Sequence, residues 1–457
     1  MKSYYAAEAL LPEGWARDVR IEVDAHGAFA RVEPGAPARG AERLAGPALP
    51  GMANLHSHAF QRAMAGLAEV RAAARDDFWT WRELMYRFVA RVTPEQIQAI
   101  ARFLYLELLK GGYTAVAEFH YVHQRPEGTA YARSGEMLLR HLEAAREAGI
   151  AITLLPSLYR WSNFGRRALE PRQARFAAEP AAILALAEEA RRAAAGHPDV
   201  RVGVAPHSLR AVDAESLAEL VAGLRAADPA APIHIHAAEQ TREVEDCLAA
   251  TGARPVEWLL EHMPVDERWC LVHATHLDAR EVRRLAASGA VAGLCPSTEG
   301  NLGDGIFALP AYRRARGRWG IGGDSHVSRD PAEELRLLEY VQRLKARRRN
   351  LVTGPRSQAV GTTLWLEAAE GGGRATGRAM GAIAPAHRAD LVVLDAAQPD
   401  LAQRAGDAIA NALVFSGATR MVRDVMVGGA WALREGRHAL EEPAARAYKD
   451  ALAALLA

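Results

Sequence analysis

The sequence has few cysteines and no long apolar run. Its three cysteines, Cys247, Cys270 and Cys295, are widely spaced among 457 residues, so we expect buried free thiols rather than a disulfide framework. No stretch approaches the roughly 18 apolar residues of a membrane helix, and no signal-peptide core follows residues 1–5. We therefore expect a cytoplasmic protein with no membrane partner.

Neither sign of charge is in excess. Lys and Arg number 56 against 55 Asp and Glu, which gives no indication of a nucleic-acid partner. No Gly-x-Gly-x-x-Gly turn follows the first apolar segment of the repeating region, which disfavours an open dinucleotide-binding sheet. What remains is a large apolar fraction, 50% of the chain, which is enough for a sizeable core.

Eight short apolar segments alternate with long stretches rich in Ala, Leu, Arg and Glu at helical spacing. The helical stretches include residues 94–110, 181–195 and 214–226. The apolar segments are 49–55, 114–119, 150–155, 200–205, 233–236, 269–273, 291–294 and 319–324. Eight such repeats predict an α/β protein with a parallel (β/α)8 TIM-like barrel over residues 49–380, and an open doubly wound sheet is the alternative.

Both chain ends indicate β structure outside this barrel. Residues 1–48 contain short strand-like segments with turns between them. Residues 381–457 continue with a turn and then a buried strand within 383–395, and with strand-like segments at 413–415, 421–426 and 430–433. We expect the two ends to form one small β-sandwich domain, followed by a helix over 441–456. The glycines at 371–373 are interpreted as a loop.

Metal-binding residue types recur where the predicted barrel strands end. His56 and His58 are two apart, so in a strand both rings point to one side. His236, His273 and Asp324 end three further strands. Active sites of parallel barrels lie at this edge, and imidazole nitrogen with carboxylate oxygen is a ligand set that zinc accepts.

Longer stretches around these residues resemble the amidohydrolase superfamily, and within it the formimidoylglutamate deiminases of histidine degradation. The stretches are residues 54–62, 118–123, 295–305 and 323–328. The resemblance implies that His56, His58, His236 and Asp324 hold one divalent metal, with Zn²⁺ expected and Fe²⁺ as an alternative. Members of the superfamily that bind two metals carry a lysine at the end of the fourth barrel strand. Here the fourth strand is expected at residues 200–205, and residues 204–210 contain no lysine. A homodimer is implied by resemblance only.

The resemblance also implies roles in the hydrolysis of N-formimino-L-glutamate to N-formyl-L-glutamate and ammonia. Asp324 accepts the proton of the attacking water, His273 orients that water, and Glu239 carries the proton to the departing nitrogen. Arg82 and Arg210 are expected to bind the two substrate carboxylates, because a guanidinium pairs with a carboxylate through two parallel hydrogen bonds. Gln61, Tyr121 and His207 are expected beside them. Whether Arg82 acts in its own subunit or in a neighbour's stays open.

Two other functions remain in view. A deaminase of a purine ring, of the guanine or S-adenosylhomocysteine type, shares the metal motifs and would use stacking residues such as Trp79, Trp81 and Trp161. A non-catalytic barrel should have lost a ligand or Glu239, and none is missing. His234 is expected in the core rather than on the metal. His120, His123 and His326 are either neighbours of the site or surface residues.

Overall fold

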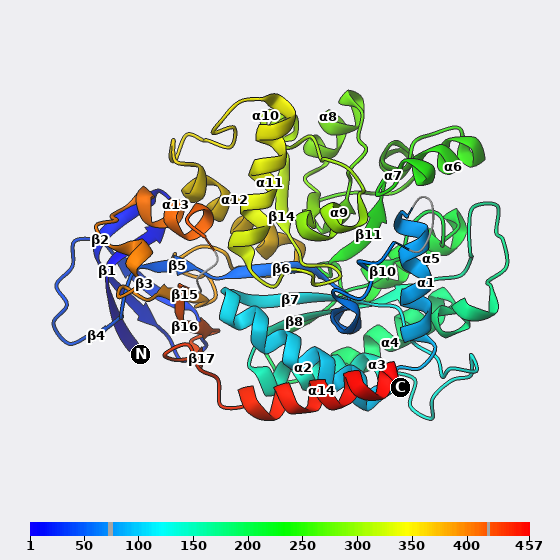
Figure 1. The fold of residues 1–457 in the computed structure, drawn as a ribbon, viewed down its shortest axis with the longest axis horizontal. Helices are drawn as coiled ribbons and strands as arrows, with labels where there is room; N and C mark the ends of the chain where they lie inside the picture. Colours follow the sequence, from blue (N-terminus) through cyan, green and yellow to red (C-terminus); the bar gives the residue numbers. More distant parts are fainter. Residues whose placement is uncertain (72–75, 418–420) are drawn as a thin grey trace.

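The computed structural model of the protein describes residues 1–71, 76–417 and 421–457. Its main body is a set of parallel strands with helices packed around them (Figure 1). The strands are β6 (Met52–Ser57), β7 (Tyr113–His120), β8 (Ala151–Leu158), β9 (Val200–Val202), β10 (Ala205–Pro206), β11 (Ile233–Ala237), β12 (Trp269–His273), β13 (Val291–Leu294) and β14 (Arg318–Ile321).

These strands form two hydrogen-bonded sheets. One joins β6, β7, β8, β9 and β10, and the other joins β11 to β14 in chain order. Parallel bridges from Val204 to Ile233 and from Ser57 to Asp324 connect the two sheets at both edges. With β9 and β10 counted as one interrupted strand, the predicted eightfold parallel barrel is confirmed.

Helices follow the strands on the outside of the barrel, as the alternating pattern predicts. They are α1 (Phe78–Val89), α2 (Pro94–Gly111), α3 (Glu136–Ala148), α4 (Pro180–Ala193), α5 (Ala214–Ala227), α6 (Thr241–Thr251), α7 (Pro255–His262), α8 (Ala279–Ser288), α9 (Pro296–Leu302), α10 (Leu309–Arg314), α11 (Pro331–Ala346) and α12 (Val360–Ala375). Their starts carry recognisable signals. For example, Thr93 and Gln96 form a capping box at the start of α2, and Pro94 occupies its first position.

The expectation of a loop at residues 371–373 is wrong, because these glycines lie inside α12. A Cβ at Gly371 would lie 1.8 Å from the carbonyl oxygen of Trp319, and one at Gly372 would lie 3.1 Å from Ala53. The helix therefore packs backbone against backbone on β14 and β6, an approach that only glycine permits. Tertiary packing overrides the poor helix propensity of glycine here.

Strands from both chain ends share one sheet beside the barrel, at the left of Figure 1. The eight strands in the described part of the chain are β1 (Lys2–Leu11), β2 (Gly14–Val23), β3 (Phe29–Glu33), β4 (Glu42–Arg43), β5 (Ala48–Pro50), β15 (Leu391–Leu394), β16 (Val422–Val427) and β17 (Ala430–Leu433). The expected sandwich is thus one continuous sheet with a small core of its own, which includes Tyr4, Val19 and Leu391. Division of the chain into 1–48 with 381–457 and 49–380 stays a prediction.

One expected strand in the tail is a helix. Residues 413–415 belong to α13 (Asp407–Phe415), whose buried Leu413 and Val414 pack against the main core. A short apolar run cannot distinguish a buried helix from a strand by its pattern alone. The final helix, α14 (Glu441–Leu456), has the predicted bounds and packs on α2, where Tyr448 stacks on Phe103 with ring centroids 4.3 Å apart.

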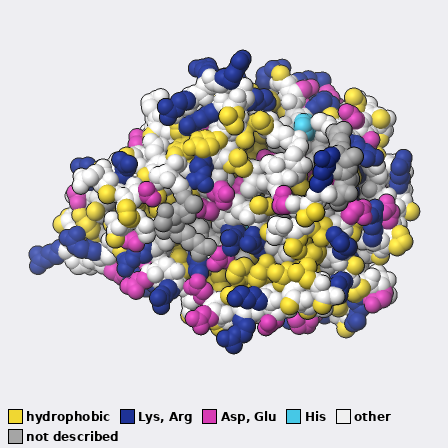
Figure 2. Space-filling view, in the orientation of Figure 1, with side chains coloured by type: hydrophobic (Ala, Val, Ile, Leu, Met, Phe, Trp, Pro, Cys, Tyr) yellow, Lys and Arg dark blue, Asp and Glu magenta, His cyan; other side chains and the backbone are white. Residues whose placement is uncertain are grey.

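Acidic and basic side chains are interspersed over the face shown in Figure 2, in agreement with the balanced composition. The three cysteines are free and buried, as expected. No helix in the described ranges combines the length and the apolar character that crossing a bilayer requires.

Candidate metal centre and substrate pocket

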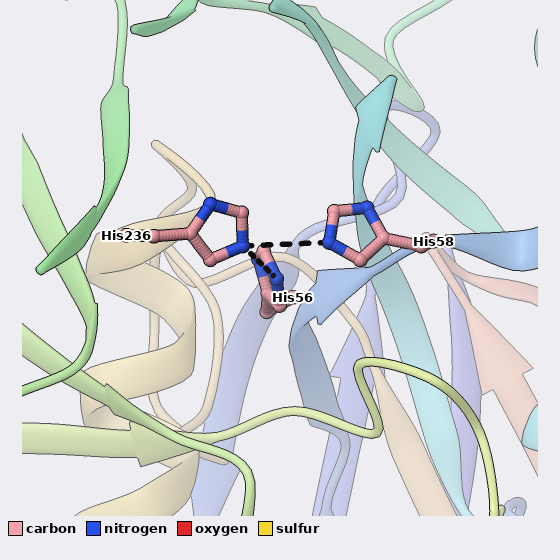
Figure 3. A group of neighbouring side chains, drawn as sticks. All are labelled: His56, His58 and His236. Atoms are coloured by element: carbon pink, nitrogen blue, oxygen red, sulfur yellow. Dashed lines mark hydrogen bonds between the residues drawn. The ribbon is translucent and has the colours of Figure 1, made fainter. Parts of the chain in front are cut away.

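Three histidine rings meet at the carboxyl ends of the barrel strands. His56 lies in β6, His58 follows this strand directly, and His236 lies in β11 on the opposite sheet (Figure 3). The Nε2 atom of His236 lies 3.1 Å from that of His56 and 3.4 Å from that of His58. Oδ1 of Asp324 lies 3.5 Å from Nε2 of both His56 and His58.

Backbone carbonyls fix the tautomers of two of these rings. The Nδ1–H of His58 donates to the Phe119 carbonyl at 2.8 Å, and the Nδ1–H of His236 donates to the His207 carbonyl at 3.0 Å. A carbonyl only accepts, so the Nε2 atoms of both neutral rings carry lone pairs that face each other. Burial lowers the pKa of His56, His58 and His236 below the usual value, which keeps all three rings neutral.

Facing lone pairs repel each other unless a cation lies between them. Zinc bonds nitrogen at about 2.0–2.1 Å, and tetrahedral angles then separate the ligand atoms by about 3.3 Å. The measured separations of 3.1–3.5 Å agree with this value. The four residues predicted as ligands therefore fit a single divalent ion.

A second group of titratable residues borders this cluster. Nε2 of His273, at the end of β12, lies 3.6 Å from Glu239 and 3.8 Å from Asp324, and it has no hydrogen-bond partner among the described residues. Burial raises the pKa of Glu239 to about 7, although His273 lowers it. Burial lowers the pKa of His273, but Glu239 and two further carboxylates raise it well above its usual value.

Sequence reasoning gave no role to Glu299, which contacts His273 from the opposite side. Its Oε1 accepts hydrogen bonds from Nδ1–H of His273 at 3.3 Å and from the Cys295 amide at 2.8 Å. Glu299 lies in α9, the helix that follows β13, and no local sequence signal points to its contact with His273. Asp304 lies near Glu239 as well, and burial raises the pKa of Asp304 to about 9.

The backbone at this edge is strained. Five non-glycine residues there have positive φ: Ala238 (53°), His273 (66°), Ala274 (48°), Asp324 (51°) and His326 (59°). Left-handed backbone is uncommon for such residues and concentrates at functional sites. The strand ends are thus bent where His273 and Asp324 lie beside the three histidine rings.

A pocket opens onto the three histidine rings, and every predicted substrate-binding residue lines it. Gln61, Arg82, Tyr121, His207 and Arg210 all line it, together with Glu239, His273 and Asp324. Gln61 donates to the Tyr121 hydroxyl at 2.8 Å, and its Oε1 has no partner in the described structure. Burial lowers the pKa of His207 well below its usual value, with Arg210 adding to the effect, so this ring is neutral.

Helix α1 presents one face to this pocket. Asp77 caps the helix through the amide of Trp79, and the lining residues Phe78, Trp81, Arg82 and Met85 follow the spacing of a single helical face. Arg82 therefore reaches the pocket of its own chain, where its Nη2 donates to the Tyr86 hydroxyl at 2.5 Å.

Neither pocket arginine is in contact with a carboxylate of the described chain. Burial lowers the pKa of Arg210, but the nearby Tyr159, Glu243 and Glu239 raise it above its usual value. Neither Arg82 nor Arg210 forms an ion pair with any residue that the structure describes. Arg210 is only 7% exposed, and its Nη1 has no hydrogen-bond partner among those residues. A buried cation in this state favours a negatively charged ligand.

The other histidines fall into two groups. His326 contacts Ser57 at 2.8 Å, and Ser57 also donates to Glu118 at 2.6 Å, so this network supports the segment between two expected metal ligands. His234 contacts the Ala375 carbonyl at 2.7 Å deep in the barrel, where the sequence placed it. His120 and His123 are buried too, and neither lines the pocket.

Comparisons with known proteins agree with this geometry. The family model of the amidohydrolase family matches residues 48–432, and that of the N-terminal domain of formimidoylglutamate deiminase matches residues 1–46. The chain is 54% identical to a formimidoylglutamate deiminase of Pseudomonas aeruginosa over 100% of both chains. It is 31% identical to a 5-methylthioadenosine/S-adenosylhomocysteine deaminase of Natronomonas pharaonis, over 83% of this chain and 80% of the relative. The crystal structure of an amidohydrolase from Brucella melitensis superimposes with a TM-score of 0.95, at 45% identity and 100% coverage of both chains.

Proposed function

Because the chain belongs to the amidohydrolase family, we propose that it hydrolyses the C–N bond of N-formimino-L-glutamate, releasing N-formyl-L-glutamate and ammonia. This reaction is a step of histidine degradation. The full-length identity of 54% to a formimidoylglutamate deiminase carries the proposal, and the pocket geometry supports it.

His56, His58, His236 and Asp324 would hold one divalent metal, and nitrogen-rich ligation favours zinc over iron. When bound, such an ion lowers the pKa of a water molecule towards neutrality. The fourth barrel strand, β9 with β10, would carry a bridging lysine at its end but is followed by His207 instead, which supports a single ion.

Proton movement is assigned to three neighbouring side chains. Asp324 faces His273 through its Oδ2 and accepts the proton of the attacking water. His273, held by Glu299, donates a hydrogen bond from Nε2 to the developing oxyanion. Glu239 titrates near neutrality, which suits a group that takes up a proton and then delivers it to the departing nitrogen.

Substrate charge is matched by the pocket arginines. N-formimino-L-glutamate carries two carboxylates, and Arg82 and Arg210 are two cations without acidic partners in the described structure. Gln61, Tyr121 and His207 supply neutral hydrogen-bonding groups around them.

The purine-deaminase alternative has less support. Trp81 lines the pocket. Trp79 does not; its ring stacks against pocket arginines, with its centroid 5.2 Å from the Arg82 guanidinium and 5.8 Å from the Arg210 guanidinium. Trp161 lies outside this pocket. A neutral purine would leave both arginines without a carboxylate in direct contact. A non-catalytic barrel is disfavoured because all ligands, Glu239 and His273 converge.

The test is ammonia release by the purified protein from N-formimino-L-glutamate, compared with N-formimino-L-aspartate, guanine and S-adenosylhomocysteine. We expect N-formimino-L-glutamate to be preferred by at least a hundredfold in kcat/KM. Turnover of a purine without turnover of either formimino diacid would overturn the assignment. The cytoplasmic location and the homodimer stay predictions.

A further inference from the structure

A second cavity lies at the opposite end of the barrel from His56, His58 and His236. It has a volume of about 910 Å³ and shares no lining residue with the substrate pocket. Strand β14 relates the two sites: its first residue, Arg318, lines the cavity, whereas Asp324 lies beyond its other end. Six arginines line the cavity: Arg313, Arg314, Arg316, Arg318, Arg374 and Arg378.

The two acids in the cavity wall are already paired. Glu367 accepts two hydrogen bonds from Arg313, at 2.7 and 2.6 Å, and a third from the Trp319 indole. Glu370 pairs with Arg356. Across the described ranges, the other five arginines form no ion pair with a carboxylate.

Arg378 shows most clearly that positive charge here is uncompensated. It is 9% exposed, and its Nη2 donates to the carbonyls of Ile152 at 2.5 Å and Asp199 at 2.9 Å. Its Nε has no partner among the described residues. Burial and the neighbouring Arg388 lower the pKa of Arg378 to about 9, although Asp390 and Asp199 raise it in part.

In a chain with a large excess of basic residues, arginines without acidic partners would be expected in many places. This chain has a formal net charge of +1, so its acids are numerous enough to balance its basic residues. Elsewhere the arginines are commonly paired with acids, for example Arg140 with Glu136 and Arg254 with Glu281. Five cations without acids around one cavity are therefore a local feature. Guanidinium groups bind phosphate and carboxylate through paired hydrogen bonds.

We propose that this cavity binds a small polyanion that carries at least two phosphate or carboxylate groups. The anion sits among Arg314, Arg316 and Arg374 at the rim, with Arg378 at the buried end. The site does not depend on the proposed catalytic function, because none of its residues belongs to the substrate pocket.

The experiment measures binding of pyrophosphate and of citrate to the full-length, metal-loaded protein by calorimetry, at constant ionic strength set with NaCl. Pyrophosphate represents the phosphate source and citrate the carboxylate source. The double variant R314Q/R374Q changes two exposed side chains and should fold. We expect saturable binding of at least one probe in the wild type and at least a tenfold weaker Kd in the double variant, with ammonia release unchanged.

Two controls separate this site from others. Arg192→Gln removes an exposed arginine on α4, remote in sequence from the cavity wall, and should leave Kd unchanged. Arg210→Met removes a substrate-pocket cation and should also leave Kd unchanged. Binding lost in Arg210→Met but kept in R314Q/R374Q would assign the anion to the substrate pocket and overturn the proposal. Absence of saturable binding of both probes at millimolar concentration would overturn it as well, without bearing on catalysis.

Discussion

Replacing Arg210 by Met tests how the pocket recognises its substrate. The side chain is 7% exposed, and its Nη1 is unpartnered within the described structure, so a substrate carboxylate would be the anion in direct contact with it. Loss of one such buried charge-assisted pair costs about 2–5 kcal/mol. At 1.36 kcal/mol per factor of ten, kcat/KM should fall by roughly 30-fold to several thousand-fold.

The loss should appear mainly in KM, because Arg210 binds the substrate and takes no part in proton transfer. Metal content should stay at the wild-type value. The variant should stay folded, since Arg210 forms no ion pair or hydrogen bond within the described residues that the substitution would remove. Ammonia release at varied substrate concentration, elemental analysis and a thermal melt give the three readouts.

Arg166→Met is the matched control. Arg166 is about half exposed and pairs with Glu215 at 2.7 Å, outside the pocket. We expect its kcat/KM to stay within about twofold of the wild type, as for most exposed ion pairs. Turnover in Arg210→Met equal to that of this control would refute the role of Arg210 in carboxylate binding.

Three further predictions concern the metal, protons and stability. His56→Ala should reduce bound metal from about one equivalent per chain to near zero by elemental analysis, whereas His262→Ala should keep it; two tightly held equivalents in the wild type would contradict the single-ion site. Glu239→Gln should lower kcat by about 10²–10⁴-fold with metal retained. Because burial raises the pKa of Glu239 to about 7, the wild-type kcat/KM should decline below that pH, and the variant should lack this decline. The same decline in the variant would assign it to another group. Burial also raises the pKa of Glu334 to about 8, above its unfolded value of 4.5. Between these two pH values the folded state binds a proton that the unfolded state has lost, so the free energy of unfolding should fall as pH rises from about 4.5 to 8. Urea titrations should show this fall, on the order of 1–4 kcal/mol, in the wild type and not in Glu334→Gln; equal pH dependence of the two proteins would disprove it.

The barrel strands were predictable from sequence because each combines a short apolar segment with a following helical stretch. His56, His58, His236 and Asp324 were predictable as a cluster for a related reason: parallel strands bring their carboxyl ends to one edge. The order of strands and helices along the chain therefore predicts where the site lies.

Other features depend on contacts that no local pattern encodes. Glu299 gains its relation to His273 only when α9 lies beside β12, and its neighbours Cys295 and Pro296 give no sign of this. Residues 413–415 are apolar in either a strand or a helix, and packing decides for α13. The cationic cavity likewise combines Arg318 with Arg374, which are distant in sequence.

The glycines of α12 also bear on the order of folding. Each glycine in a helix interior costs about 1 kcal/mol relative to alanine, so three in succession leave α12 without stability of its own. Its partners are Ala53 in β6 and Trp319 in β14, near the two ends of the barrel sequence. The helix should therefore form only after these first and last strands have met, and protection of its amides during refolding would report the moment of barrel closure.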